Sequence, residues 1–257
     1  MAETFTKREP GADPDFFAAQ AAGLRWLADA GGVHIVGVRD VGSESIELER
    51  VREVGPDIES ARRFGRDLAV MHAAGAASFG APPPGYSGTN FIGSLAQPCK
   101  PEASWGVFYA RQRVLPFVDM AVEAGNLRPD AADDVRRACD LIESGEFDDG
   151  ESPARLHGDI WAGNVLWTPE GVVLIDPAAH GGHRETDLAM LALFGCPYLD
   201  DILEAYDKES PLRDGWRERI PLHQLHPLAV HAAGHGPSYG AALHDSALAV
   251  LRARRSS

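Results

Sequence analysis

The sequence predicts an α+β chain of two lobes, a small N-terminal lobe that contains strands and a larger, mostly helical C-terminal lobe. Short apolar, β-branched runs indicate strands before residue 54, whereas helical periodicity dominates afterwards. At 257 residues, the chain is long enough for two lobes around a cleft. We place the N-terminal lobe at residues 1–54, with a hinge at about 49–54, and the C-terminal lobe at residues 55–257.

The N-terminal lobe is expected to begin with a strand over residues 4–8. A helix follows, because Asp13 and Pro14 suit a cap with proline in the first turn and apolar residues then recur at helical spacing until Gly31. The runs at 33–38 and 45–51 predict the two strands of a hairpin.

The C-terminal lobe is expected to be built mainly from helices. A helix is predicted over about 57–74, and the proline-rich stretch after it predicts an extended loop up to residue 104. Helical patterns return at residues 105–124, 130–144, 185–194, 201–207, 217–233 and 239–254. Pro116, Pro221 and Pro227 lie inside these patterns and should kink or split the helices.

The most informative segment runs from His157 to Asn164 (HGDIWAGN) and is followed twelve residues later by Asp176. Two apolar runs, with a turn at 168–171 between them, predict a hairpin directly after Asn164. The residue that enters the first strand and the residue that leaves the second lie at the same end of a hairpin. We therefore expect Asn164 and Asp176 to meet, with Asp159 within reach of both.

Protein-kinase-like enzymes hold a catalytic base and magnesium ligands in this way. Mg²⁺ prefers a few hard oxygen ligands and completes its shell with water and phosphate. Asn164 and Asp176 would supply such oxygens, which leaves Asp159 free to accept the proton of a substrate hydroxyl. Each residue alone is also a common turn former. Their spacing on one hairpin favours the kinase-type site.

Composition excludes several other classes. The formal net charge is −14, which disfavours a nucleic-acid partner because phosphate neutralisation needs basic patches. The three cysteines have neither metal-ligand nor redox spacing, and no apolar run approaches a membrane span. We expect a cytoplasmic protein without a membrane partner, either a monomer or a homodimer. The histidines between 223 and 235 do not share one helix face, so a metal site there is disfavoured.

With these motifs, the chain resembles the fructosamine kinase (ketosamine kinase) family, which is related to aminoglycoside phosphotransferases and choline kinases. The resemblance is carried by the segments 157–164, 175–178 and 182–190, with weaker echoes at 90–97, 105–110 and 225–226. It implies a protein-kinase-like fold. It also implies ATP- and Mg²⁺-dependent phosphorylation of a sugar hydroxyl on a small-molecule or protein-bound ketosamine, as a step of deglycation.

The resemblance also assigns roles by position. Asp159 would be the base, and Asn164 and Asp176 would be the magnesium ligands. Lys7 matches the strand lysine that contacts the ATP phosphates. Backbone groups from Glu49 to Val51 would meet adenine at the hinge.

For other residues, the resemblance leaves more than one role open. Trp161 suits either a platform for a sugar face or packing of the loop. For Glu185 and Asp187, support of the catalytic loop is favoured over contact with the substrate. His183 is a further candidate for lining the cleft.

Two departures from the family pattern stand out. Only six residues precede Lys7, so the strand pair that covers the ATP phosphates is expected to be missing or to lie upstream. The helix position of the glutamate that pairs with the lysine is occupied by Gln20, whose amide could accept a hydrogen bond from Lys7 but supplies no ion pair. The substitution Gln20→Glu is therefore predicted to improve ATP use.

Two alternatives remain open. One is a kinase for another hydroxylated amine, such as an aminoglycoside or choline, which would share Asp159, Asn164 and Asp176. The other is a pseudokinase with little turnover, motivated by Gln20 and the short N-terminus. The presence of all three site residues argues against a pseudokinase.

Overall fold

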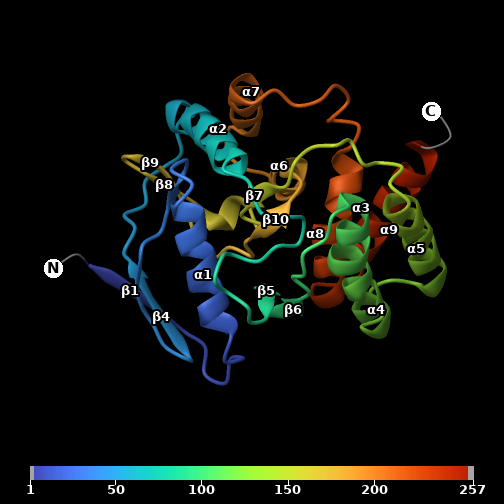
Figure 1. Ribbon diagram of the computed structural model, residues 1–257, viewed down its shortest axis with the longest axis horizontal. Helices are drawn as coiled ribbons and strands as arrows, with labels where there is room; N and C mark the ends of the chain where they lie inside the picture. The colour runs from blue at the N-terminus through green and yellow to red at the C-terminus, as the bar shows by residue number, and fades with distance from the viewer. Residues whose placement is uncertain (1–2, 254–257) are drawn as a thin grey trace.

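The computed structural model describes residues 3–253; residues 1–2 and 254–257, at the outer ends of the two predicted lobes, lie outside the described part. A small antiparallel sheet stands at one edge of the molecule (Figure 1). Its order is β1-β4-β3, formed by Thr4–Arg8, Ser45–Glu49 and Val38–Val41. Helices make up most of the opposite side, so the α+β class and the two-lobed arrangement agree with the prediction. The boundary at residue 54 stays a prediction.

Helix α1 (Phe16–Ala28) lies between this sheet and the rest of the molecule (Figure 1). It begins slightly later than predicted. Asp15 is the residue that precedes its first turn, and the Asp13 side chain accepts the Asp15 N–H at 2.9 Å. The helix buries one apolar face, with Phe17 and Leu27 fully enclosed, so it couples the sheet to the core.

The predicted pairing of residues 33–38 with 45–51 is correct only at its last residue, because Val38 pairs with Leu48 whereas residues 34–35 pair with another strand. Residues His34–Ile35 form β2, which runs parallel to β9 (Gly171–Leu174). Strand β4 pairs with β1 on one side and with β3 on the other, and the pairing with β3 has a bulge between Val38 and Asp40. The run at 33–38 is apolar and β-branched, so its pattern alone could not show which strand it pairs with. Burial does, because Ile35 and Val36 are 4% and 3% exposed and fill the central core.

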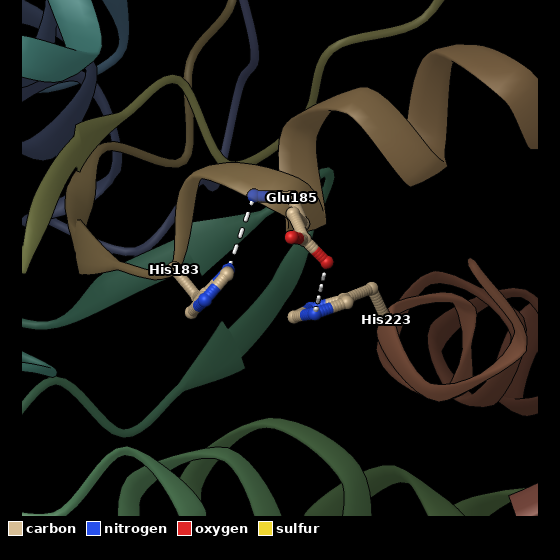
Figure 2. Close-up of side chains that lie close together, drawn as sticks. All are labelled: His183, Glu185 and His223. Carbon is tan, nitrogen blue, oxygen red and sulfur yellow. Dashed lines mark hydrogen bonds and ion pairs between the residues drawn. The ribbon is translucent and has the colours of Figure 1, made fainter. Parts of the chain in front are cut away.

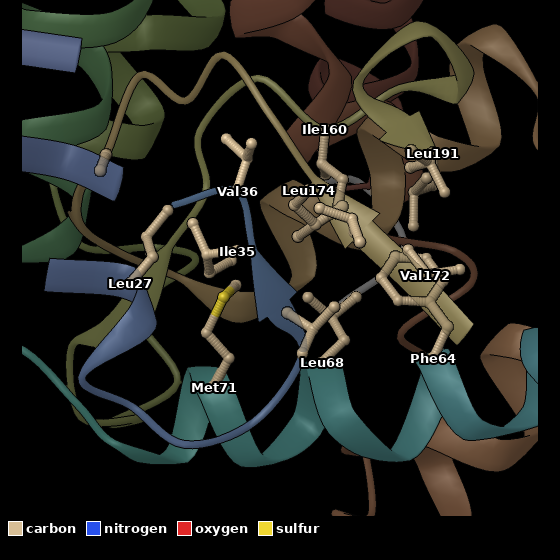
Figure 3. Close-up of a cluster of buried hydrophobic side chains, with 14 of the residues drawn as sticks. Leu27, Ile35, Val36, Phe64, Leu68, Met71, Ile160, Val172, Leu174 and Leu191 are labelled. Atoms are coloured by element: carbon tan, nitrogen blue, oxygen red, sulfur yellow. The ribbon is translucent and has the colours of Figure 1, made fainter. Parts of the chain in front are cut away.

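Helix α2 (Ile58–Ala73) matches its prediction within a residue, because the Asp57 side chain accepts the Ser60 N–H at 2.9 Å and caps the helix. It lies across the sheet β2-β9-β8, in which β8 is Val165–Thr168, and packs against α7 (Leu199–Glu209). Side chains from α1, β2, α2, β9 and α6 (Arg184–Phe194) meet in one apolar core (Figure 3). The labelled members are Leu27, Ile35, Val36, Phe64, Leu68, Met71, Ile160, Val172, Leu174 and Leu191.

The segment predicted as an extended loop contains a second small hairpin. Strand β5 (Asn90–Ile92) pairs with β6 (Leu95–Gln97) across a turn at Gly93, which has a φ of 54°. Each strand has only three residues. That length is too short for an alternating pattern to emerge from the sequence.

The remaining helices lie close to where the patterns predicted them. The prolines inside these patterns do not all kink or split the helices as predicted. Residues 105–123 form one helical run: α3 (Trp105–Phe108), a π-helical segment (Tyr109–Val114) and α4 (Leu115–Glu123). Pro116 is the second residue of α4, directly after the π-helical segment. Beside this run lies α5 (Pro129–Glu143), which packs against it.

The C-terminal helices are α6 (Arg184–Phe194), α8 (Ile220–Gly234) and α9 (Pro237–Ala253). Pro221 lies in the first turn of α8, and Pro227 lies inside α8 without splitting it. A proline leaves the carbonyl four residues earlier without its helical donor. Here that carbonyl belongs to His223, and the Tyr109 hydroxyl donates to it at 2.8 Å. Among residues 3–253, no helix is long and apolar enough to cross a membrane.

Candidate active site

The catalytic hairpin forms as predicted. Strand β8 (Val165–Thr168) pairs with β9 from Val165↔Leu174 to Thr168↔Gly171, and a short 3₁₀ turn ending at Asn164 precedes it. The N–H of Ile175 donates to the Asn164 carbonyl at 3.2 Å. Asn164 and Asp176 therefore lie at the same end of the hairpin.

Asp159 lies beside Asn164. The Asn164 side-chain nitrogen donates to the Asp159 carbonyl at 2.7 Å and to Asp159 Oδ2 at 3.3 Å. This leaves the amide oxygen of Asn164 without a hydrogen-bond partner in the described part of the chain. Burial raises the pKa of Asp159 to about 7, which outweighs the hydrogen bond from Asn164. Such a carboxyl can take up or release a proton near neutral pH.

The loop that carries Asp159 is held by Asp187, in the first turn of α6. The backbone N–H groups of His157 and Gly158 donate to its two oxygens at 2.8 and 3.0 Å. Burial alone would raise the pKa of Asp187. The hydrogen bond with His72, the charges of His72 and His157 and the backbone N–H of Gly158 together outweigh burial and hold that pKa below its ordinary value. The His157 ring lies 2.9 Å from the Ile175 carbonyl through Nε2, so it braces the loop against the hairpin.

His72 is a supporting residue that the sequence did not reveal. It lies on α2, where its Nε2 is 3.2 Å from Asp187 Oδ2 and its Nδ1 is 2.8 Å from the Tyr206 hydroxyl. In the sequence it falls on the apolar face of a helix, where a histidine resembles an ordinary core residue. Nothing local links it to a loop 85 or more positions away; only the tertiary fold does.

Lys7 and Gln20 both reach Asp176. Lys7 Nζ lies 3.0 Å from Asp176 Oδ2, and the Gln20 side-chain nitrogen donates to Asp176 Oδ1. Asp176 itself has a φ of 52°, a left-handed conformation that is uncommon for residues other than glycine. The strand, the helix and the hairpin therefore converge on one carboxylate.

Two pockets flank this carboxylate, and both include Lys7 and Asp176 in their walls. The first measures about 370 Å³ and lies between the N-terminal sheet, the hinge and the hairpin. Glu49 and Val51, the two residues assigned to the predicted hinge, line it. The second measures about 240 Å³ and is bounded by α1, the β5–β6 hairpin and the catalytic loop; its walls also include Phe16, Gln20, Phe91, Asp159, Trp161 and Asn164. The sequence did not single out Phe16 or Phe91.

Trp161 is exposed at the mouth of this second pocket. The residue is 42% exposed, and its ring lies edge-on to Phe194 at a centroid distance of 6.4 Å. It also covers Gly163, where an added Cβ would lie 2.5 Å from a ring carbon. Trp161 therefore packs on its own loop and presents ring surface to solvent, so both predicted roles are compatible with its position.

His183 and Glu185 lie elsewhere. Neither lines the two pockets beside Asp176, and both are buried, at 5% and 2% exposure. Glu185 accepts hydrogen bonds from Arg219 at 2.6 and 2.9 Å, and His223 Nε2 lies 3.4 Å from it. The structure thus gives Glu185 a contact with α8 instead of the catalytic loop.

His183, Glu185 and His223 lie close enough together to be tested as metal ligands (Figure 2). The Glu185 N–H donates to His183 Nδ1 at 3.2 Å, so a neutral His183 ring carries its proton on Nε2. That nitrogen faces Asp149 Oδ2 at 3.3 Å. With no lone pair left on His183, and with Arg219 against Glu185, this cluster is an ion-pair network that joins α6 to α8.

The fold and this arrangement of residues define the class of the protein. The structure of the choline kinase LicA from Streptococcus pneumoniae superposes with a TM-score of 0.59 at 16% identity, covering 98% of this chain and 87% of that chain. At that identity the likeness shows the fold alone. The chain therefore has a kinase-like fold.

The chain belongs to the fructosamine kinase family, whose family model, described as fructosamine kinase, matches residues 1–252. A protein of Enterococcus faecium named "Probable ketoamine kinase" is 30% identical over 238 residues, which cover 92% of this chain and 83% of that protein. The crystal structure named "putative fructosamine-3-kinase" from Thermobifida fusca is 46% identical with a TM-score of 0.90, covering 98% of this chain and 86% of that chain. The chain is a kinase, as predicted.

Proposed function

We propose that this kinase transfers the γ-phosphoryl group of ATP to a sugar hydroxyl of a ketosamine. The observation that carries the proposal is the meeting of Asp159, Asn164 and Asp176 at one end of a hairpin, beside two pockets that share Asp176. The names of the relatives, ketoamine kinase and fructosamine-3-kinase, support a ketosamine as the acceptor.

The larger pocket is the proposed site of adenine. Leu48, Leu166 and Ile175 offer apolar surface to the faces of the base. The Glu49 N–H already donates to the Gly37 carbonyl at 2.8 Å, whereas the Val51 N–H has no hydrogen-bond partner within residues 3–253. Adenine carries acceptor nitrogens on its edge, so the Val51 N–H is the hinge donor that we assign to it.

The donor set at Asn164 and Asp176 fits Mg²⁺. An amide oxygen without a partner and a carboxylate, both at the edge of a pocket, are hard oxygen ligands of the kind that Mg²⁺ takes alongside phosphate. When bound, the metal would neutralise charge on the phosphates. Lys7, which shares both pockets, would contact the same phosphates as a second cation.

Asp159 is the proposed base. As the sugar hydroxyl oxygen bonds to the γ-phosphorus, the bond from phosphorus to the ADP oxygen breaks and the hydroxyl proton passes to Asp159. A carboxyl whose pKa is about 7 suits a proton acceptor that must be ionised near neutral pH. Asn164 keeps that carboxyl oriented through two hydrogen bonds. The products are ADP and a phosphorylated ketosamine.

Trp161 is the proposed platform for the acceptor, since its exposed ring borders the pocket that contains Asp159. The substrate would be a free or protein-bound ketosamine, and the reaction would serve deglycation in the cytoplasm. His183 and Glu185 are not part of this proposed acceptor site.

Substrate profiling tests the proposal. Wild-type protein is incubated with ATP, Mg²⁺ and, separately, fructose-lysine, ribulose-lysine, choline and an aminoglycoside. We expect phosphorylated product from the ketosamines at a kcat/KM at least about a hundredfold above that of the other acceptors. A preference for choline or the aminoglycoside would overturn the ketosamine assignment while leaving the kinase class intact.

A further inference from the structure

Gln20 makes its side-chain hydrogen bond to Asp176 and not to Lys7. The side chain is 6% exposed on α1, and its nitrogen donates to Asp176 Oδ1. An ionised carboxylate can only accept, so the amide nitrogen must face it. The other amide atom, Oε1, is buried without a hydrogen-bond partner in the described part of the chain. The amide oxygen therefore does not accept from Lys7.

Lys7 makes its only ion pair within residues 3–253 with the same carboxylate. The two oxygens of Asp176 thus have different partners. Oδ2 faces Lys7, a cation on a side chain that is 33% exposed. Oδ1 faces a neutral amide on a buried helix face. The flexible Lys7 side chain can break this ion pair and bind the phosphates of a nucleotide instead. The Gln20 amide cannot move in the same way, because the packing of α1 fixes its position.

We propose that Gln20 is a positioning residue for Asp176. It holds one oxygen of the carboxylate while the other is released from Lys7 to the metal. This inference rests on the proposed function, in which Asp176 binds Mg²⁺, and it gives Gln20 a role that a glutamate could not fill. A carboxylate at position 20 would face Asp176 with like charge and would attract Lys7 to itself.

The test separates metal binding from nucleotide binding. We would compare wild type with Gln20→Leu, which keeps the volume of the side chain but removes the donor. Gln224→Leu is the matched control, because Gln224 also lies on a helix and donates to a backbone carbonyl, that of Ala189, away from both pockets. Binding of Mn²⁺ with a non-hydrolysable ATP analogue is followed by water-proton relaxation, and binding of the analogue without metal by calorimetry.

For Gln20→Leu we expect the dissociation constant of Mn²⁺ to rise about tenfold, the size of one hydrogen bond to a charged group, with metal-free nucleotide binding changed less than about twofold. The Gln224→Leu control should change neither. An unchanged Mn²⁺ dissociation constant, or a loss confined to metal-free nucleotide binding, would overturn the inference. These are binding measurements, so they stay informative even if no ketosamine is turned over.

A second variant, Gln20→Glu, gives a kinetic readout. The inference reverses the expectation from the sequence: turnover should fall at limiting Mg²⁺ and recover in part at high Mg²⁺. A rate above wild type at every Mg²⁺ concentration would contradict it. If wild type also turns over the ketosamine, such a rate for Gln20→Glu would remove only the proposed role of Gln20. The proposed function would then stand.

Discussion

The backbone N–H of His157 donates to Asp187 Oδ2 at 2.8 Å, which joins the start of the catalytic loop to the first turn of α6. Gly158 donates to the other oxygen at 3.0 Å, and His72 approaches from α2. Three segments thus converge on a side chain that is 1% exposed. The loop that positions Asp159 is therefore held by a carboxylate that does not border either pocket.

The first prediction concerns Asp187→Ala. It leaves two backbone N–H groups and His72 without their acceptor in a buried place, so we expect a loss of about 3 kcal/mol of unfolding free energy and a fall in melting temperature of about 6–12 °C. Asp133→Ala is the control, because the side chain of that aspartate is 73% exposed and its one ion pair within residues 3–253 is with Arg136. Thermal unfolding measures both. A melting temperature within about 1 °C of wild type for Asp187→Ala would show that the loop is held by other contacts.

The second prediction concerns Trp161→Ala. Because the ring is 42% exposed, its loss should lower the melting temperature by less than about 3 °C but raise the KM for the ketosamine about tenfold, with the KM for ATP unchanged. Trp216→Ala serves as the contrast: that residue is 7% exposed, so truncation should cost about 3 kcal/mol of stability. Equal KM values for Trp161→Ala and wild type would leave Trp161 with loop packing alone.

The third prediction is a pH dependence of stability carried by Glu185. Burial would raise the pKa of Glu185, but hydrogen bonds from His223 and Arg219 outweigh burial and lower that pKa to about 2. A lowered carboxyl pKa adds stability that is complete above its ordinary value of about 4.5 and is lost as the pH falls toward 2.

Urea unfolding at pH 6 and pH 3 measures this effect against Glu185→Gln. Wild type should lose about 2 kcal/mol more than the variant between the two pH values, and the variant should already be less stable at pH 6. Parallel losses in the two proteins would mean that Glu185 keeps an ordinary pKa.

The fourth prediction concerns Tyr109→Phe. The hydroxyl of Tyr109 donates to the carbonyl that Pro227 leaves without a helical donor, and it lies 3.2 Å from the His226 N–H. Removing it should cost about 1–3 kcal/mol of unfolding free energy, measured by urea titration. Tyr198→Phe, on a residue that is 44% exposed, should change stability by less than about 0.5 kcal/mol. Equal effects of the two variants would indicate that α8 tolerates Pro227 without help.

The catalytic hairpin could be predicted because its information is local. Asn164, Asp176 and the turn between them lie within thirteen consecutive residues, and the hairpin rule alone brings the two side chains together. Helix boundaries were likewise predictable where a cap was present, as at Asp57.

Long-range choices were not predictable in the same way. The parallel pairing of β2 with β9 joins segments about 139 positions apart, and the apolar run at 33–38 offered no basis for assigning its residues to that distant strand. The roles of His72 and of the β5–β6 hairpin beside the acceptor pocket depend on tertiary contacts. Gln20 was predicted to lie near Lys7, and the structure places both on Asp176, but the direction of its amide followed only from the structure.

The most direct test of the account is the product formed from ATP, Mg²⁺ and fructose-lysine by wild type and by Asp159→Asn. The variant keeps the shape of the side chain but cannot accept the hydroxyl proton. Mass spectrometry should show one added phosphoryl group on the sugar adduct with wild type, dependent on Mg²⁺, and a rate lower by a factor of about 10²–10⁴ with the variant. Equal rates for the two proteins, or no phosphorylated adduct with wild type, would contradict the central claim that Asp159 is the base of a ketosamine kinase.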